Sequence, residues 1–303
     1  MKNLNDLTVV IVTFQTPEKI ILDCLRSINK DVKIIIVENS EAFSHEKAVN
    51  LEFFNVKILC TGKNLGYGKG NNFGLKQVKT DYALILNPDV ICSEDLFEKI
   101  PEVVNKIKNF AIIGFQYSYD NIFMPAGFFN EKKNSQFVED FKNNKIDSIS
   151  NVEWVTGCSM LLNLKEFKNK EIFDMNFFLY FEEFDLCKSL INSGKNIFTA
   201  KELKIHHLGF KSSIDEKKND NSKMIKLKDW HYMWSSFYFY RKNYSYFYAL
   251  KKFISKFLSS LFKMIFYSIL FQKINRDKYL YRFLGIYNSM LGYKSSFRLK
   301  KFY

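Results

Sequence analysis

Three features are missing from this sequence, and each absence excludes a class of protein. The five cysteines stand singly with no Cys-x-x-Cys pair, which argues against a disulfide framework or zinc site and indicates a reducing compartment. The N-terminus lacks a basic-then-apolar leader with a small-residue cleavage site, so residues 7–14 are expected to start a first strand. In the amphipathic stretch that begins at Leu250, the longest uncharged run is Met264–Gln272, too short for a conventional transmembrane helix.

Acidic residues are nearly missing from the last part of the chain. Residues 241–303 contain 14 Lys and Arg but one acid, Asp277, so their net charge of +13 equals that of the whole protein. Of the 52 aromatic residues, 25 lie at or after Trp230. A basic, aromatic segment on a neutral body indicates an anionic partner, either a membrane or a nucleic acid.

The first 90 residues alternate apolar runs with helical patterns such as 18–28. The apolar runs predict four strands, at 7–14, 32–40, 56–62 and 82–90. Because these runs are continuously apolar and separated by helices, we expect an α/β fold with a mostly parallel sheet covered on both faces. The hydrophobic content of 47% is ample for its core.

Polar side chains follow three of the predicted strands. They are Thr13, the tripeptide 38–40 (Glu-Asn-Ser) and the tripeptide 87–89 (Asn-Pro-Asp). Ligands of parallel sheets bind beyond the C-terminal strand ends, so these residues are expected to border one site. Taken alone, Asp89 is better explained by turn chemistry, because Asn, Pro and Asp favour turns.

Two glycine-containing segments can approach a ligand closely with their backbone. "GKNLGYGKGNNFGLK" (62–76) resembles a phosphate-binding loop leading into a helix, although a flexible polar connection explains it as well. "VEWVTGCSMLLN" (152–163) carries Gly157 in the middle of an apolar run.

Carboxylates and imidazoles are grouped in two places. "FEEFDL" (181–186) follows a strand-like run at 177–181, and crowded acids there suit a general base, the alternative being an acid-rich helix N-terminus. His206-His207 follows an apolar strand and precedes a polar stretch, 214–223, that reads as a linker. Beside Asp89 such a histidine would make a mixed N/O site for Mg²⁺ or Mn²⁺; otherwise it is structural.

From Leu250 to Ile269 the chain shows a regular amphipathic helix with lysines on its polar side. This pattern favours an anionic membrane surface as partner of residues 241–303. The alternatives are packing on the rest of the chain or on a second subunit. Nucleic-acid binding is disfavoured because it gives no reason for the acidic clusters at strand ends.

Seven motifs, in one order, resemble a family 2 glycosyltransferase with the GT-A fold, especially its bacterial rhamnosyltransferase-like branch. The resemblance covers about residues 7–213. The motifs are "VTFQ" (12–15), "VENS" (37–40), "NLGYGKGNNFG" (64–74), "LNPD" (86–89), "GCSML" (157–161), "FLYFEEFDL" (178–186) and "HHLGFKS" (206–212).

The resemblance implies roles for particular residues. It implies Mg²⁺ or Mn²⁺ at the donor's phosphates, held by Asp89 with His206. Glu183 takes the place of the usual catalytic aspartate, with Glu182 second and Asp185 also open. Nucleotide-sugar contacts are implied for Thr13, Glu38, Asn39, Asn64, Gly66, Asn72, Asn87 and Gly157.

Three departures from the family pattern bear on these roles. Gln15 replaces a common Asn, Glu38 replaces an Asp and is one methylene longer, and Glu183 replaces the Asp of the acidic pair. The last change leaves open which carboxylate is the base.

The resemblance also implies an inverting, metal-dependent transfer in bacterial surface polysaccharide, capsule or lipooligosaccharide synthesis. The first-choice donor is dTDP-rhamnose and the alternative is a UDP-hexose, with a glycan or lipid-linked acceptor. Residues 1–229 would form the GT-A catalytic domain. Residues 230–303 would be a helical region that oligomerises or holds the protein, peripherally, at the inner face of the cell membrane. A catalytically dead scaffold is a further alternative.

Overall fold

The computed structural model describes residues 1–118, 126–209 and 221–298, which form two compact units. The first unit comprises the described parts of Met1–Leu65, Lys69–Phe173 and Leu186–Ile214; the second comprises those of Gly66–Gly68, Asp174–Asp185 and Asp215–Tyr303. The motif 206–212 beyond Gly209 and most of the expected linker 214–223 lie outside the described residues. The domain boundary expected after residue 229 stays a prediction, and packing groups residues 174–185 with the C-terminal helices.

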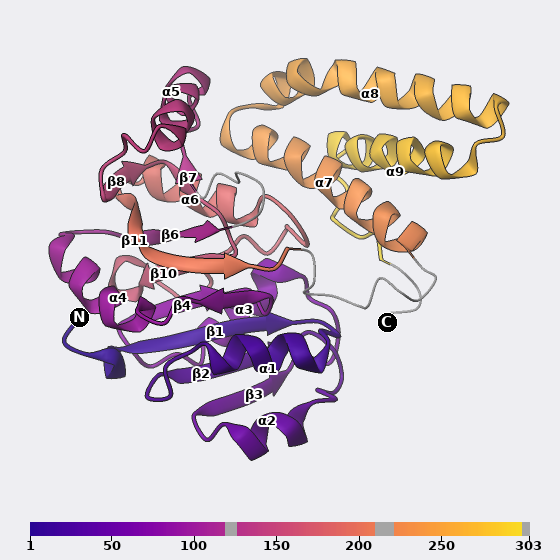
Figure 1. Cartoon of the computed structure of the whole chain (residues 1–303). Helices are drawn as coiled ribbons and strands as arrows, with labels where there is room; N and C mark the ends of the chain where they lie inside the picture. Colours follow the sequence, from indigo (N-terminus) through magenta and orange to yellow (C-terminus); the bar gives the residue numbers. More distant parts are fainter. Residues whose placement is uncertain (119–125, 210–220, 299–303) are drawn as a thin grey trace. The chain divides into compact units, whose positions relative to one another are not determined.

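The first unit is built on a nine-stranded sheet of order β3-β2-β1-β4-β10-β6-β11-β5, with β8 paired to β11 (Figure 1). Strands β3, β2, β1 and β4 run parallel, whereas β10 is antiparallel to both of its neighbours. The predicted α/β class and the parallel order of the first four strands are confirmed. The strands are β1 Leu7–Thr13, β2 Lys33–Glu38, β3 Val56–Cys60, β4 Tyr82–Leu86, β5 Val90–Cys92, β6 Ile112–Ser118, β8 Ile149–Val152, β10 Ser159–Asn163 and β11 Ile197–His207.

Helices and short elements complete this part of the chain. A small second sheet pairs β7 (Ala126–Gly127) with β9 (Trp154–Val155), and short 3-10 turns lie at Leu4–Asp6 and Leu164–Glu166. The helices are α1 Glu18–Arg26, α2 Glu46–Glu52, α3 Tyr67–Leu75, α4 Leu96–Lys106, α5 Glu131–Lys142 and α6 Glu182–Asn192.

Continuous burial explains the sheet. Val9, Val10 and Ile11 of β1 are each at most 1% exposed, as are Leu84, Ile85 and Leu86 of β4. A strand covered on both faces needs apolar side chains at successive positions, not at alternate ones. The apolar runs in the sequence were therefore a direct signal for central strands.

The prediction of a strand at 177–181 is wrong. Tyr180 and Phe181 adopt left-handed backbone conformations, with φ of 70° and 69°, and helix α6 starts immediately after them at Glu182. Two successive left-handed residues cannot continue an extended ladder. The apolar run of this motif therefore forms a turn.

The second unit contains three packed helices, α7 (Asn221–Asn243), α8 (Tyr246–Ile269) and α9 (Lys273–Met290). Their core consists of Met233, Phe237, Ala249, Phe253 and Ile286. The helix predicted for 250–269 is confirmed as part of α8. None of the helices in the described ranges is long and apolar enough to cross a membrane.

Gly74 marks the closest approach of α3 to the sheet. A Cβ at this position would lie 2.6 Å from Val10 Cγ1 and 2.8 Å from Val37 Cγ2. We expect Gly74→Ala to lower the free energy of unfolding by about 1–3 kcal/mol, because this overlap outweighs alanine's better helix propensity of about 1 kcal/mol. Urea denaturation of the full chain measures the change. Ser135→Ala on α5 is the control and should stay within about 0.5 kcal/mol of the parent protein; a stabilised Gly74→Ala would contradict the close packing.

Candidate active site

Glu38 is the central side chain at the ends of β1 and β2. Parallel pairing places it directly beside Thr13, whose hydroxyl donates to Glu38 Oε2 at 2.6 Å. Ser40 Oγ and the backbone N–H of Gln15 donate to Oε1 at 2.7 and 3.3 Å. The carboxylate is 3% exposed, so these three donors hold a buried acceptor in a fixed place.

A pocket of about 170 Å³ opens beside Glu38. A cavity of about 150 Å³ is enough to take up one benzene ring. His45 lies at its wall, with Nδ1 3.1 Å from Glu18 Oε2 and Nε2 3.1 Å from the carbonyl oxygen of Thr16. The lining residues are Gln15, Thr16, Pro17, Glu38, Ser40, Ala42, Phe43, Ser44 and His45.

Phe43 and His45 were missed in the sequence. Their rings meet edge to face at 5.7 Å in the connection between β2 and α2. The available signal was a histidine, one of only four in the chain, shortly after a predicted strand end.

Asp89 follows β4 and is 1% exposed. His207 Nε2 lies 3.4 Å from Asp89 Oδ1, because β11 pairs with β5 so that His207 lies opposite Val90. His206, the expected ligand, is exposed instead, since successive residues of a strand face opposite sides. The structure thus brings Asp89 together with the neighbouring histidine.

These two side chains do not make a metal site by themselves. Among the residues that the structure describes, no group of three or more His, Cys, Asp or Glu side chains could hold an ion by itself. A carboxylate and an imidazole are nevertheless suitable donors for Mg²⁺ or Mn²⁺, which commonly keep water and substrate phosphate as further ligands. Asp89 and His207 therefore fit a divalent ion that takes its remaining ligands from a bound diphosphate.

Asn72 of α3 binds the chain's own backbone. Its Nδ2 donates to the carbonyl oxygen of Phe173 at 2.8 Å, while Oδ1 accepts from the N–H groups of Ile172 and Phe173 at 2.9 and 3.0 Å. The residue is 2% exposed. These three bonds tie Asn72 to the backbone of residues 172–173, a structural role that the sequence did not predict.

The other predicted amide and glycine residues have varied surroundings. Asn39 is buried, and its Oδ1 accepts a hydrogen bond from the Thr61 hydroxyl at 3.4 Å. Asn64 is partly exposed. Asn87 and Gly157 are partly buried. The backbone N–H of Asn87 donates to the carbonyl oxygen of Cys158 at 2.9 Å. Gly66, with φ of 86°, lies where a Cβ would be 2.1 Å from the carbonyl oxygen of Phe178, so this tight approach requires glycine.

The three carboxylates at the start of α6 differ in their environments. Glu182 is buried, with no hydrogen-bond partner for Oε1 among the described residues, and desolvation and the neighbouring Glu183 raise its pKa. Glu183 is partly exposed, and desolvation raises its pKa to about 7. Asp185 is buried, and both of its oxygens accept hydrogen bonds, from Lys242 at 2.6 Å and Asn243 at 2.8 Å. Asp185 is therefore the least available of the three as a base.

Comparison with known proteins agrees with the fold. The family model described as glycosyl transferase family 2 matches residues 8–163, just over half of the 303 residues. The chain belongs to glycosyl transferase family 2.

Two sequence relatives and one solved structure are similar to this glycosyltransferase. Rhamnosyltransferase WbbL of Escherichia coli (strain K12) is 25% identical over 243 residues, 70% of this chain and 84% of WbbL. Low-salt glycan biosynthesis hexosyltransferase Agl10 of Haloferax volcanii is 24% identical over 197 residues, 61% of each chain. The mannosyltransferase PcManGT from Pyrobaculum calidifontis, solved with GDP-Man and Mn²⁺, has a TM-score of 0.53 at 9% identity over 96% of this chain and 90% of that one. That likeness shows the shared GT-A fold.

The environment of Asn72 predicts a stability defect in this glycosyltransferase. Asn72→Ala would leave two backbone N–H groups and one carbonyl without their partner, and each such buried group costs about 1–3 kcal/mol. We expect the free energy of unfolding to fall by about 3 kcal/mol or more in urea denaturation. Asn50→Ala, at an exposed position of α2, is the matched control and should change it by less than about 0.5 kcal/mol. Equal, small effects of both variants would show that Asn72 has no such structural role.

Proposed function

We propose that this chain is an inverting, metal-dependent glycosyltransferase that uses a pyrimidine nucleoside-diphosphate sugar. The first-choice donor is dTDP-rhamnose and the alternative is a UDP-hexose. The acceptor is a glycan or a lipid-linked glycan of bacterial surface polysaccharide, capsule or lipooligosaccharide synthesis. The two sequence relatives, a rhamnosyltransferase and a hexosyltransferase, support these two choices.

The pocket beside Glu38 carries this proposal. A carboxylate has about four lone-pair sites, and three protein donors use three of them. One acceptor site is left for a ring N–H of thymine or uracil, or for a ribose hydroxyl, and the pocket has room for one planar ring. Both proposed nucleotides present the same ring N–H.

Asp89 and His207 are proposed to face the diphosphate of the donor. Mg²⁺ or Mn²⁺ bound there would neutralise the charge that develops on the departing nucleoside diphosphate. His207 takes the role first expected of His206, because its imidazole is the one next to Asp89.

Glu183 is the proposed general base. It takes the proton of the acceptor hydroxyl while the hydroxyl oxygen attacks the anomeric carbon from the side opposite the diphosphate. The bond between the anomeric carbon and the diphosphate oxygen breaks, and its electron pair leaves with the nucleoside diphosphate, so the configuration inverts. A pKa near 7 leaves a useful fraction of Glu183 ionised at neutral pH while keeping it basic enough to accept this proton.

The transfer rate is expected to follow the ionisation of Glu183. Because the raised pKa leaves the carboxyl protonated at low pH, initial rates with dTDP-rhamnose or a UDP-hexose should rise roughly tenfold between pH 6 and pH 8. Glu183→Gln should lose at least about a hundredfold in kcat while still binding dTDP or UDP in calorimetry with Mn²⁺. Glu182→Gln is the matched control. Transfer retained by Glu183→Gln, or no transfer by the parent protein with either donor, would refute the assignment.

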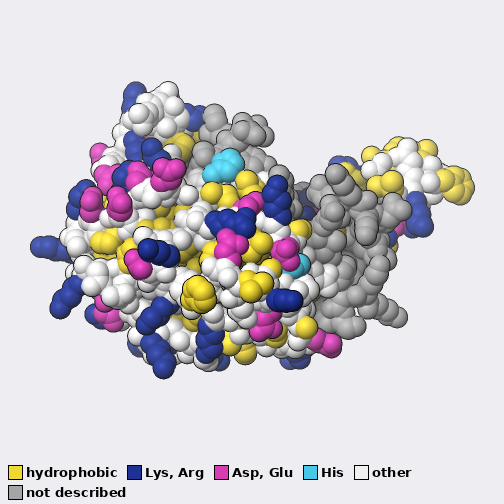
Figure 2. Space-filling view, turned by 60° about the horizontal axis from the view of Figure 1, so that its bottom comes forward, with side chains coloured by type: hydrophobic (Ala, Val, Ile, Leu, Met, Phe, Trp, Pro, Cys, Tyr) yellow, Lys and Arg dark blue, Asp and Glu magenta, His cyan; other side chains and the backbone are white. Residues whose placement is uncertain are grey.

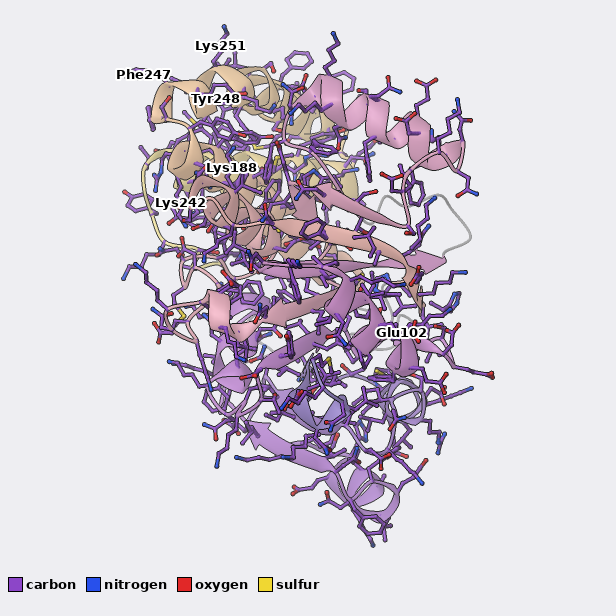
Figure 3. All side chains as sticks on the ribbon, turned by 90° about the vertical axis from the view of Figure 1, so that its left-hand side faces the viewer. Glu102, Lys188, Lys242, Phe247, Tyr248 and Lys251 are labelled. Carbon is purple, nitrogen blue, oxygen red and sulfur yellow. The ribbon has the colours of Figure 1, made fainter. Side chains whose placement is uncertain are left out.

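We also propose that the second unit binds an anionic membrane surface at the cytoplasmic face. Helix α8 uses one face for its partners α7 and α9 and leaves a second apolar row exposed. Phe247 and Lys251 lie at its start, at the outer edge of the view in Figure 3, and both are exposed. The row consists of Phe247, Ile254, Leu258, Phe262, Ile265 and Ile269, between 41% and 80% exposed.

The end of this row continues into the α8–α9 connection. Phe271 is 94% and Ile274 78% exposed, and Figure 2 shows hydrophobic side chains gathered at this tip, at the far right of the view. Lys251, Lys256 and Lys263 are exposed along the same helix. An apolar row accompanied by cations suits the headgroup region of an anionic bilayer.

Removing the row should abolish membrane binding without unfolding the protein. The variant Leu258→Ser, Phe262→Ser, Ile269→Ser should bind vesicles containing phosphatidylglycerol at least about tenfold more weakly in sedimentation, since each lost side chain contributes about 1–3 kcal/mol. Phe54→Ser, at a 96% exposed position of the first unit, is the matched control. Unchanged sedimentation would exclude the membrane role. A shift from dimer to monomer in light scattering would assign the row to a second copy instead.

A further inference from the structure

One face of α7 holds the segment 174–185 that carries the acidic motif. Ser235 Oγ donates to the carbonyl oxygen of Leu179 at 2.8 Å. The ring of Tyr232 lies 5.7 Å from the rings of both Tyr180 and Phe181, and Phe239 lies 5.6 Å from Phe181. Residues three, four and seven apart share a helix face, so these contacts come from one side of α7.

The turn held by these contacts is strained. Left-handed backbone costs a residue with a side chain about 1–2 kcal/mol, and Tyr180 and Phe181 adopt it in succession. Such a conformation persists only where its surroundings determine it. Because this turn immediately precedes Glu182, the contacts of α7 decide where α6 begins.

Lys242 adds a charge to the same face of α7. Its Nζ lies 2.7 Å from Asp174 Oδ2 and 2.6 Å from Asp185 Oδ2. The two carboxylate side chains are only 14% and 4% exposed, whereas the Lys242 side chain is 36% exposed. One partly exposed cation therefore bridges two largely buried anions at either end of the strained turn.

The bridge changes the titration of both carboxyls. Desolvation acts to raise the pKa of Asp174, but Lys242, the N–H of Asn176 and Tyr238 outweigh it, so the pKa is lowered. Desolvation raises the pKa of Asp185, and Lys242 and Asn243 oppose this rise. Without Lys242, both buried carboxylates would lose the one cation that lies close to them among the residues the structure describes. Besides each other, the titratable and charged groups that interact with these two carboxyls are Glu182 of α6 and Tyr238 and Lys242 of α7.

We propose that Lys242 is a positioning residue for the acidic motif: it holds Asp174 and Asp185 as carboxylates and thereby fixes the start of α6 and the basicity of Glu183. Asp185 is then an anchor, not a base. The inference rests on the proposed role of Glu183, and it makes α7 a part of the catalytic machinery in addition to its place in the helical unit.

The pH profile distinguishes this role from simple packing. Lys242→Met should lower kcat about tenfold, leave the donor KM unchanged, and move the midpoint of the pH–rate profile upward, because an uncompensated negative charge disfavours ionisation of Glu183. Lys242→Arg, which keeps the charge, should stay within about threefold of the parent protein with an unmoved midpoint. Adding Asp185→Asn to Lys242→Met should return the midpoint toward the parent value. A uniform loss of rate at every pH would overturn the proposal.

Thermal unfolding of the full chain gives a readout that needs no transfer. Lys242→Met should lower the Tm, and Asp185→Asn should restore part of the loss, because the double variant leaves one buried carboxylate fewer without its cation. A double variant that unfolds no higher than Lys242→Met would overturn the proposal. If the parent protein transfers no sugar but this coupling is present, the proposed function fails while the charge bridge stands. If transfer occurs and the two changes are additive, only the positioning role fails.

Discussion

The parallel pairing of β1 with β2 is the interaction on which the candidate nucleotide pocket depends. It sets Thr13 opposite Glu38 at the edge where both strands end. Buried carboxylates need donors, and the register supplies one in Thr13 while the turns that follow supply Ser40 and the N–H of Gln15. A slip of one residue would turn Glu38 to the other face of the sheet. The register therefore gathers the Glu38 carboxylate and its donors at one edge of the sheet.

The acidic motif depends on a different element. Its segment is held by α7, through aromatic contacts on a strained turn and through the bridge from Lys242 to Asp174 and Asp185. Three carboxylates that look alike in the sequence thereby acquire different properties. Both oxygens of Asp185 accept hydrogen bonds. Glu182 is buried with a raised pKa, and Glu183 stays partly exposed with a pKa of about 7. Such separation of environments is how neighbouring acids take different roles.

The hydrophobic residues of the second unit form both a buried core and an exposed surface row. Its aromatic residues build a core around Phe237 and Phe253 and also form the exposed row of α8. The amphipathic pattern predicted the helix, because the apolar positions recur with helical spacing. It did not predict that the apolar side of α8 is wide enough both to pack against α7 and α9 and to leave an apolar row exposed. That division depends on which helices pack together.

The sequence by itself determined the class of the sheet, its first four strands, the family and the strand-end residues Thr13, Glu38 and Asp89. These follow from local signals, because continuous apolar runs identify buried strands and polar residues identify where they end. Only the tertiary structure placed His207 beside Asp89, showed Asn72 bound to the backbone of 172–173, and turned the expected strand at 177–181 into a strained turn. It also joined Lys242 to Asp185, 57 residues earlier in the chain. Partners so distant in the chain leave no periodic trace in a single sequence, since only folding brings them within hydrogen-bonding distance.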